Sequence, residues 1–279
     1  MKYIAVLMTC HNRKVKTIAC LEALHNCHLP NENTFDVFLV DDGSIDGTSI
    51  EVLSRFPDVK VIQGNGLLFW NRGMCLAWSE AAKGNYDYYL WLNDDTILKP
   101  DALQILMSCL DKVGESSIVC GVCETKIDGE VTYSGLNKKT EEKLIPNGVP
   151  QLCDYFNGNV VLVPASVFNV VGNLDPIFHH GLGDFDYGMR ASKQGIKSYV
   201  TTESIAYCEK NDLTKWFNPK YSLIERLSVF TTPLGGVPFQ FFEYAKRHYG
   251  YKKAITNFLT IHIRLIFPRF WNKYIKAEK

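Results

Sequence analysis

Two adjacent carboxylates, Asp94 and Asp95, directly follow the unbroken apolar run 88–92. Such a run without helical spacing predicts a buried strand of a parallel sheet, and ligands of open α/β sheets bind at the carboxyl ends of the strands. Adjacent carboxylates repel each other and need a positive partner, and their hard oxygens suit Mg²⁺ or Mn²⁺. We therefore expect Asp95 and Asp94 to hold a divalent metal ion. The alternative is that these residues, or Thr96, cap the helix that follows.

A second acid pair, Asp41 and Asp42, follows the apolar run 35–40. Asp-Gly after a strand is also a common turn, so this pair alone is weak evidence for a site. Two acid-tipped strands at one edge of a sheet are stronger evidence. One pair can accept hydrogen bonds from a base or a ribose, while the other holds a metal on a diphosphate. The sequence thus predicts a nucleotide site at this edge.

The elements that would position these acids alternate between strands and helices over residues 3–97. This order predicts an α/β fold with a mostly parallel, Rossmann-like sheet flanked by helices. No G-x-G-x-x-G follows the first strand and no G-x-x-x-x-G-K-[ST] occurs, which argues against a dinucleotide dehydrogenase and a P-loop enzyme. A phosphatase with an aspartyl nucleophile would need Asp-x-Asp-x-Thr where this chain has Thr9-Cys10-His11.

Composition narrows the class of protein. The formal net charge is zero, from 30 basic and 30 acidic residues, which argues against a nucleic-acid partner. Among the nine cysteines, Cys120-Gly-Val-Cys123 has no second pair at zinc spacing, so we expect a core strand there and mostly reduced, buried thiols. The opening MKYIAVLMTC does not resemble a signal peptide, and no run reaches the ~20 apolar residues of a transmembrane helix. These features predict a cytoplasmic protein.

The chain resembles a family 2 glycosyltransferase with the GT-A fold. The matching segments are, in order, IAVLMTCHNR, VFLVDDGSIDGT, YLWLNDD in the place of the family's DxD-type motif, FNGNVVLVP and HHGLGDFDYGMR. The resemblance covers residues 3–230. It implies a catalytic domain over residues 1–230, with a nucleotide-sugar half at about 1–97 and an acceptor half at about 98–230. Residues 231–279 would form a helical C-terminal extension.

The glycine-rich loop 64–74 resembles the donor-site loop of family members, some of which are bacterial rhamnosyltransferases. Backbone N–H groups at a helix start favour a diphosphate, and Arg72 could donate to it in a bidentate manner. The alternative is that Trp70 packs in the core and Arg72 is solvated. The donor-binding residues that we expect are Thr9, Asn12, Arg13, Asp41, Asp42, Asn65, Asn71, Arg72 and Asp94.

The segment 179–190 matches the family's acidic motif, and the resemblance implies that Asp184 is the catalytic base. The family's glutamate before it is Gly183 in this chain. Asp186 and Arg190 are spaced for an i,i+4 ion pair, which favours a structural role for Asp186. The expected acceptor-binding residues are Asn157, Gly158, Asn159 and His180, although Asn-Gly also favours a turn and the histidine pair has a structural alternative.

Family members often carry a late histidine as a further metal ligand, but residues 205–210 contain a cysteine and no histidine. A cysteine suits Mg²⁺ poorly. The metal would then be held mainly by Asp95 and the donor diphosphate. Residues 238–279 mix basic and aromatic side chains, which predicts contact with an anionic membrane, such as the inner face of the plasma membrane. The alternative is packing on the catalytic domain or on a second subunit in a homodimer.

Together these features predict an inverting glycosyltransferase. It would move a sugar from a nucleoside-diphosphate sugar, of the UDP or dTDP type, to a hydroxyl of a glycan or lipid-linked acceptor in surface polysaccharide synthesis. The alternative is a non-catalytic sugar-nucleotide-binding scaffold of a polysaccharide assembly complex. Gly183 and the absent late histidine keep that alternative open.

Overall fold

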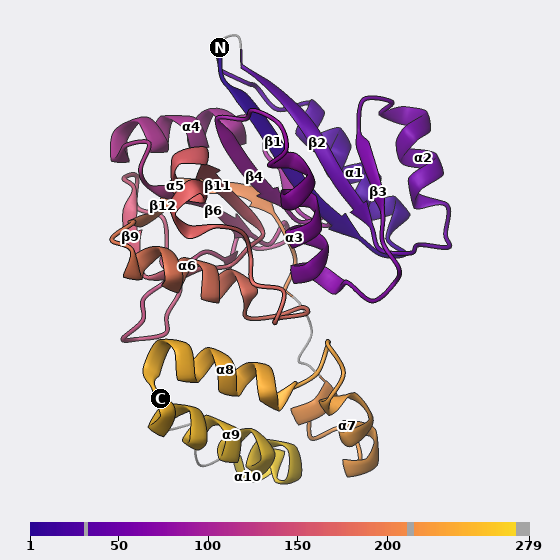
Figure 1. Ribbon diagram of the computed structural model, residues 1–279, viewed down its shortest axis with the longest axis vertical. Coiled ribbons are helices and arrows are strands. Elements are labelled where there is room, and N and C mark those ends of the chain that lie inside the picture. Colours follow the sequence, from indigo (N-terminus) through magenta and orange to yellow (C-terminus); the bar gives the residue numbers. More distant parts are fainter. Residues whose placement is uncertain (31–32, 211–214, 272–279) are drawn as a thin grey trace. The chain divides into compact units, whose positions relative to one another are not determined.

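The computed structural model describes residues 1–30, 33–210 and 215–271, and the chain divides into two compact units (Figure 1). The first unit comprises Met1–Pro176 and Gly183–Lys210, and the second comprises Ile177–Leu182 and Asn211–Lys279. The boundary of the catalytic domain at residue 230 is a functional boundary, and it stays a prediction.

A mixed sheet forms the centre of the first unit. Its strands lie in the order β3-β2-β1-β4-β11-β6-β12-β5, with β7 beside β6 and β9 beside β12. The bounds are β1 Tyr3–Cys10, β2 Thr34–Asp41, β3 Lys60–Gln63, β4 Tyr88–Leu92, β5 Ile97–Leu98, β6 Ile118–Glu124, β7 Val131–Tyr133, β9 Gln151–Cys153, β11 Val160–Pro164 and β12 Ser198–Tyr207. The strands β8 (Gly135–Leu136) and β10 (Tyr155–Phe156) pair separately.

The first four strands of this sheet pair in parallel, as the alternation of elements predicts. β11 then runs antiparallel to β4, with Val160 opposite Leu92. The fold class, a Rossmann-like α/β sheet flanked by helices and followed by further helices, is confirmed. Because β11 begins where β4 ends, the turn before β11 lies beside the segment that follows β4.

Helices cover both faces of the sheet, which explains why its central strands are apolar throughout. On β1, Ile4, Val6 and Met8 pack on one face, and Ala5 and Leu7 pack on the other, following the two-residue period of a strand. The first face is covered by α1 (Lys14–His25), α2 (Thr48–Arg55) and α4 (Ala102–Val113), and the second by α3 (Phe69–Ala81), α5 (Ala165–Val171) and α6 (Gly183–Lys193) (Figure 1).

The cysteines follow the sequence-based expectation. Cys120 and Cys123 lie in β6 and are fully buried, so the CxxC segment is a core strand. All nine cysteines are free thiols, and most of them are buried.

The second unit is helical over its described residues. Its elements are a 3-10 turn at Lys215–Phe217, α7 (Leu223–Phe230), α8 (Pro238–Tyr249), α9 (Tyr251–Ile266) and α10 (Pro268–Phe270). Trp216, Phe230, Ile261 and Leu265 form its small apolar core. In the part of the chain that the structure describes, no helix has the length and apolarity needed to cross a bilayer. Residues 272–279, which contribute Lys273 and Lys276 to the predicted basic face, lie outside that part.

Candidate active site

The two acid pairs lie at the same edge of the sheet. Asp41 is the last residue of β2, and Asp94 and Asp95 lie just beyond Leu92, the last residue of β4. β1 separates the two strands and is parallel to both, so their carboxyl ends share one side of the sheet. The edge predicted from the apolar runs is therefore formed.

A guanidinium group bridges the second acid pair. Arg13 Nη1 lies 2.8 Å from Asp94 Oδ1 and 3.1 Å from Asp95 Oδ2, and Lys16 Nζ lies 3.9 Å from the same Asp95 oxygen. Arg13 and Lys16 reach the pair from the loop after β1 and the start of α1. Burial raises the pKa of Asp94 to about 6, because desolvation outweighs the opposing charge of Arg13. The positive partner that the pair requires is thus supplied partly by the protein.

The first acid pair holds the glycine-rich loop. Asp42 accepts hydrogen bonds at Oδ1 from the N–H of Gly66 (2.8 Å) and at Oδ2 from those of Leu68 and Phe69 (both 2.9 Å). The Leu68 and Phe69 donors are orphan N–H groups at the start of α3, so a carboxylate from the segment after β2 caps this helix, while the Gly66 donor belongs to the preceding loop. The cap lies where α3 begins, at Phe69. Asp41 accepts from the Ser44 N–H (2.9 Å) and the Ser49 hydroxyl.

The other residues expected at the donor side surround this loop. Asn12 accepts from the Ile45 N–H at 2.8 Å, and Asn65 accepts from the Leu67 N–H at 3.0 Å. Thr9 is buried at the end of β1, where Gly73 of α3 approaches it closely. These contacts shape the loops, and a direct contact with a donor stays a prediction for each of these residues.

Asn71 and Arg72 extend from α3 to the segment before α6. Asn71 is fully buried and donates to the Asp175 carbonyl at 2.8 Å, and Arg72 Nε donates to the Pro176 carbonyl at 2.8 Å. Both side chains support that segment, and their contact with a donor stays a prediction.

Asp184 lies in the first turn of α6 and is partly buried. Its Oδ2 accepts from the Gly158 N–H at 2.9 Å, and its Oδ1 accepts from the Phe185 N–H at 2.9 Å. No ion pair reaches Asp184 from the described ranges 1–30, 33–210 and 215–271. Burial raises the pKa of Asp184 to about 6, because these two backbone donors offset only part of the desolvation.

A short series of contacts connects Asp184 to the acid edge. Gly158, whose N–H reaches Asp184, lies against Trp70, so that an added Cβ would come within 2.6 Å of the indole. Trp70 Nε1 donates to Asn93 Oδ1 at 2.6 Å, and Asn93 directly precedes Asp94. The predicted base and the predicted metal ligands are therefore brought into one region by three contacts.

A family model described as Glycosyl transferase family 2 matches residues 5–169. This chain belongs to glycosyl transferase family 2. The match contains both acid pairs and the turn 157–159, and it ends before Asp184.

Solved structures share the fold of this family 2 glycosyl transferase. S. aureus TarS has a TM-score of 0.59 at 13% identity over 100% of this chain and 46% of that chain. A structure of S. aureus TarS 1-349 in complex with UDP-GlcNAc has a TM-score of 0.56 at 13% identity over 100% of this chain and 77% of that one. This chain thus spans about half the length of the first TarS structure. No curated protein matches it.

The residue at the expected place of the family's late histidine is Cys208. Its Sγ lies 3.8 Å from Asp95 Oδ1, and the Asn159 amide donates to the same sulfur at 3.4 Å. Burial raises the pKa of Cys208 to about 11, with the Asp95 charge acting in the same direction. At neutral pH this group is therefore a neutral thiol, which is a poor ligand for a hard cation.

The acid pair fits a metal ion that takes most of its ligands from elsewhere. Asp94 Oδ2 is buried and has no hydrogen-bond partner among the described residues, so part of the charge of the pair is unmatched. In the same part of the chain, no group of three or more His, Cys, Asp or Glu residues is placed to hold a metal ion. One or two carboxylates with substrate phosphates is the usual arrangement for Mg²⁺, and the two aspartates meet it.

The turn before β11 lies beside the segment that leads from β4 to the acid pair. The Asn159 carbonyl accepts from the Asn93 N–H at 3.0 Å, and the Asn157 side chain accepts from the Ser134 N–H at 3.3 Å. His180 belongs to the second unit, and its predicted contact with an acceptor stays a prediction. Asp186 pairs with Arg190 at 2.8 Å, as the i,i+4 spacing predicts.

The structure adds residues that sequence reasoning did not assign to the site. Lys16, Asn93 and Cys208 contact the acid pair or its backbone, and Trp70 contacts the turn that holds Asp184. The available signals were weak. Lys16 lies one helical turn after Arg13, and Asn93 stands inside the acidic motif.

Proposed function

We propose that this family 2 glycosyl transferase moves a sugar from a nucleoside-diphosphate sugar to a hydroxyl group with inversion at the anomeric carbon. The observation that carries the proposal is Asp184, a carboxylate with a pKa of about 6 and two backbone donors, connected through Gly158 and Trp70 to the acid edge. A single base beside a leaving-group site supports a single displacement. One displacement at the anomeric carbon inverts its configuration.

In this reaction Asp184 takes the proton of the acceptor hydroxyl. The acceptor oxygen forms a bond to the anomeric carbon, and the bond from that carbon to the diphosphate oxygen breaks, so that the electron pair leaves with the nucleoside diphosphate. A base with a pKa near the working pH is both ionised and able to accept a proton. The Gly158 and Phe185 N–H groups each donate to one carboxylate oxygen, and together they fix the orientation of this side chain.

Asp95 and Asp94 would hold a divalent cation, Mn²⁺ or Mg²⁺, with the donor phosphates as further ligands. When bound, such a cation neutralises charge on the leaving diphosphate. Arg13 contributes a fixed positive charge at the same place because it contacts both carboxylates. We infer that Arg13 keeps Asp94 ionised at neutral pH when the cation is absent.

The donor would lie along the loop 64–74 and the acid edge. Asp42 fixes this loop through three backbone N–H groups, and Asp41, Asn12 and Asn65 shape the neighbouring turns. A fixed loop supports recognition of a base and ribose of the UDP or dTDP type. S. aureus TarS 1-349, which shares this fold, has been solved in complex with UDP-GlcNAc, and a donor of that class is consistent with the same edge here.

The acceptor would approach from the side of Asn157, Gly158 and Asn159. Small and amide residues in this turn let a sugar hydroxyl come close to the backbone. A glycan or lipid-linked acceptor of surface polysaccharide synthesis is consistent with the second unit, where Phe239, Tyr251 and Phe267 are more than half exposed. We infer that residues 238–270 contact an anionic membrane on its cytoplasmic face.

Calorimetric titration of UDP, GDP and deoxythymidine diphosphate, each with Mn²⁺ and with EDTA, tests this function. We expect one nucleotide to bind more tightly with Mn²⁺ than with EDTA. An Asp95→Asn variant should lose the metal-dependent part of the affinity and keep the metal-independent part. A matched control is Asp111→Asn, which makes the same change at an exposed position of α4.

Two outcomes would contradict the proposal in different ways. A folded protein that binds none of the three nucleotides would show that the acid edge is structural. Tight nucleotide binding without turnover on any acceptor would favour the non-catalytic scaffold, because binding and catalysis would then be separated at Asp184.

A further inference from the structure

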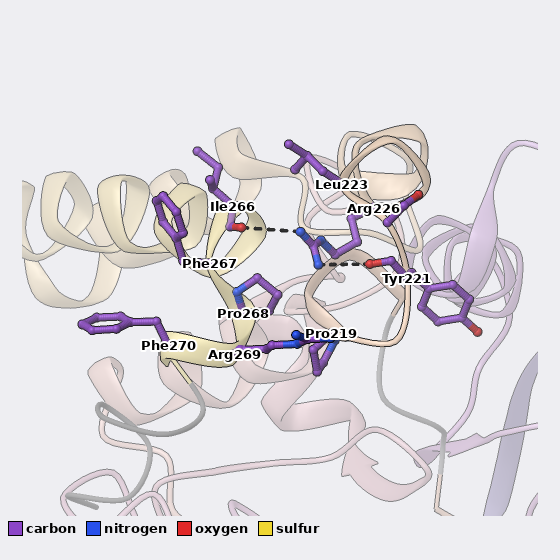
Figure 2. A pocket seen from close by; sticks show the side chains of 10 residues that line it. Pro219, Tyr221, Leu223, Arg226, Ile266, Phe267, Pro268, Arg269 and Phe270 are labelled. Carbon is purple, nitrogen blue, oxygen red and sulfur yellow. Dashed lines mark hydrogen bonds between the residues drawn. The ribbon is translucent and has the colours of Figure 1, made fainter.

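A pocket of about 450 Å³ lies within the second unit, between the start of α7 and the end of α9. Its wall is formed by Tyr221, Leu223 and Arg226 on one side and by Ile266, Phe267 and Arg269 on the other (Figure 2). Two arginines and no acidic residue line the pocket. Its volume is in the range of small-molecule sites. The pocket therefore combines positive charge with apolar and aromatic surface.

Arg226 is the polar centre of this pocket. Its side chain is buried, with 7% of the residue exposed, and it reaches from α7 to the end of α9. Nη1 donates to the Tyr221 carbonyl at 3.1 Å and Nη2 donates to the Ile266 carbonyl at 3.4 Å (Figure 2). Because Ile266 is the last residue of α9, the second contact caps a helix C-terminus, where a positive charge is favourable. This contact gives Arg226 a structural role.

These two hydrogen bonds do not satisfy the whole guanidinium group of Arg226. Both carbonyl partners are neutral, and Arg226 Nε has no hydrogen-bond partner among the described residues. The neighbouring acid, Glu225, is engaged in the capping box of α7 with Ser222. No ion pair to Arg226 or Arg269 occurs within residues 1–30, 33–210 and 215–271. A buried positive charge without a counterion is costly, and an anionic ligand would offset that cost.

We propose that this pocket binds the phosphate group of an anionic phospholipid headgroup. Guanidinium groups recognise phosphate oxygens through several charge-assisted hydrogen bonds, which the exposed Arg269 can supply, while the buried Arg226 adds a second positive charge to the pocket wall. The rim carries exposed apolar side chains at Leu223, Ile266 and Phe267, which are 41%, 46% and 59% exposed. A free phosphate would leave this rim in water, whereas a lipid at a membrane surface would cover it.

This inference depends on the proposed membrane contact in one respect, which is that the membrane supplies the lipid. It is independent of sugar transfer, because all residues of the pocket lie in the second unit. It adds a specific headgroup site to a basic and aromatic surface that would otherwise attract any anionic membrane.

The test is co-sedimentation of the full chain with vesicles of phosphatidylcholine, with and without an equal amount of phosphatidylglycerol. Arg269→Ala removes an exposed pocket charge, and Lys253→Ala removes an exposed charge from the first turn of α9, away from the pocket. Loss of one surface charge weakens binding about fivefold, whereas loss of a charge-assisted hydrogen bond as well weakens it about tenfold or more. We expect the Lys253 variant to show the smaller effect, the Arg269 variant the larger, and Arg269→Lys to restore part of the binding.

Arg226→Lys extends the test to the buried position, with thermal unfolding to report the loss of the helix cap. Equal losses for the Arg269 and Lys253 variants would overturn the proposal in favour of a non-specific charged face. Soluble glycerol phosphate binding as tightly as dihexanoyl-phosphatidylglycerol would show that the pocket takes a free phosphate and not a lipid. Nucleotide binding by the first unit, measured in the same samples without vesicles, distinguishes a failure here from a failure of the proposed function.

Discussion

Replacement of Asp184 by asparagine should remove the catalytic base and leave the fold intact. Asparagine has the same shape, and its side-chain oxygen can still accept the Gly158 N–H at the 2.9 Å position. General-base catalysis contributes about 10²–10⁴-fold, or ~3–5 kcal/mol of barrier. We therefore expect turnover to fall by that factor, while the KM for the donor changes little because Asp184 does not hold the diphosphate.

The pH dependence of the wild-type rate is an independent test of the role of Asp184. Burial raises the pKa of Asp184 to about 6, and the base works only when ionised. With that pKa, about nine-tenths of the groups are ionised at pH 7 and about one-tenth at pH 5. The rate at low substrate concentration should thus fall about tenfold between these pH values. The Asp184→Asn variant should lose this acidic limb.

The assay is release of nucleoside diphosphate from the donor identified by calorimetry, measured from pH 5 to pH 8. Asp111→Asn on the exposed face of α4 is the matched control for the loss of one carboxylate. Turnover of the Asp184 variant at the level of this control would refute the assignment of the base. An unchanged rate with a strongly raised KM for the donor would instead assign Asp184 to donor binding.

Two further predictions concern the stability of the site. Asp94 has a pKa of about 6 in the folded state, above its value in the unfolded chain. The folded state therefore favours the protonated carboxyl, and the contribution of Asp94 to the free energy of unfolding decreases as the pH rises from about 4 to about 6. Because Arg13 opposes this shift, Arg13→Gln should destabilise the protein by about 1–2 kcal/mol at pH 7 and by less at pH 5, and an equal loss at both would contradict this account of the pair. Gly183→Ala should cost about 1–3 kcal/mol in urea unfolding, because an added Cβ would overlap the Asn71 side chain. Gly181→Ala, where no atom lies within 4 Å of an added Cβ, should be near neutral, and equal effects of the two changes would show that packing does not explain Gly183.

The close packing around Gly183 also explains why this chain lacks the glutamate that the family's acidic motif has before Asp184. The sequence alone shows that a glutamate is missing before Asp184, which favours either a weakened site or a scaffold. The structure supplies a packing reason, since Asn71 of α3 occupies the space that any side chain at 183 would need. The absence of the glutamate is therefore not by itself evidence against catalysis.

Much of the fold followed from local patterns. The unbroken apolar run 88–92 predicted a strand buried on both faces, and β4 is buried at each of its five positions. The i,i+4 spacing of Asp186 and Arg190 predicted their ion pair. These features depend on residues close in the chain, where periodicity and spacing decide the contacts.

The start of α3 shows where such patterns stop being sufficient. The sequence indicates a glycine-rich loop over residues 64–74, but α3 begins within it at Phe69, where Asp42, more than twenty residues earlier, caps the helix. A capping carboxylate from a distant segment cannot be found from the residues around a helix start. The hydrogen bond from Trp70 to Asn93 cannot be found from local patterns for the same reason, because Trp70 lies in α3 and Asn93 follows the end of β4.

The sequence by itself determined the alternating fold, the edge at which the two acid pairs meet and the identity of the family. Only the tertiary structure decided that Arg13 joins Asp94 to Asp95, that Cys208 stands beside Asp95, and that the N–H of Gly158 reaches Asp184. It alone also decided that Arg226 is buried with an unused Nε. These contacts join segments that are far apart in the chain. The interaction energies of their charged and polar groups depend on distance and desolvation, which residue spacing in a sequence does not specify.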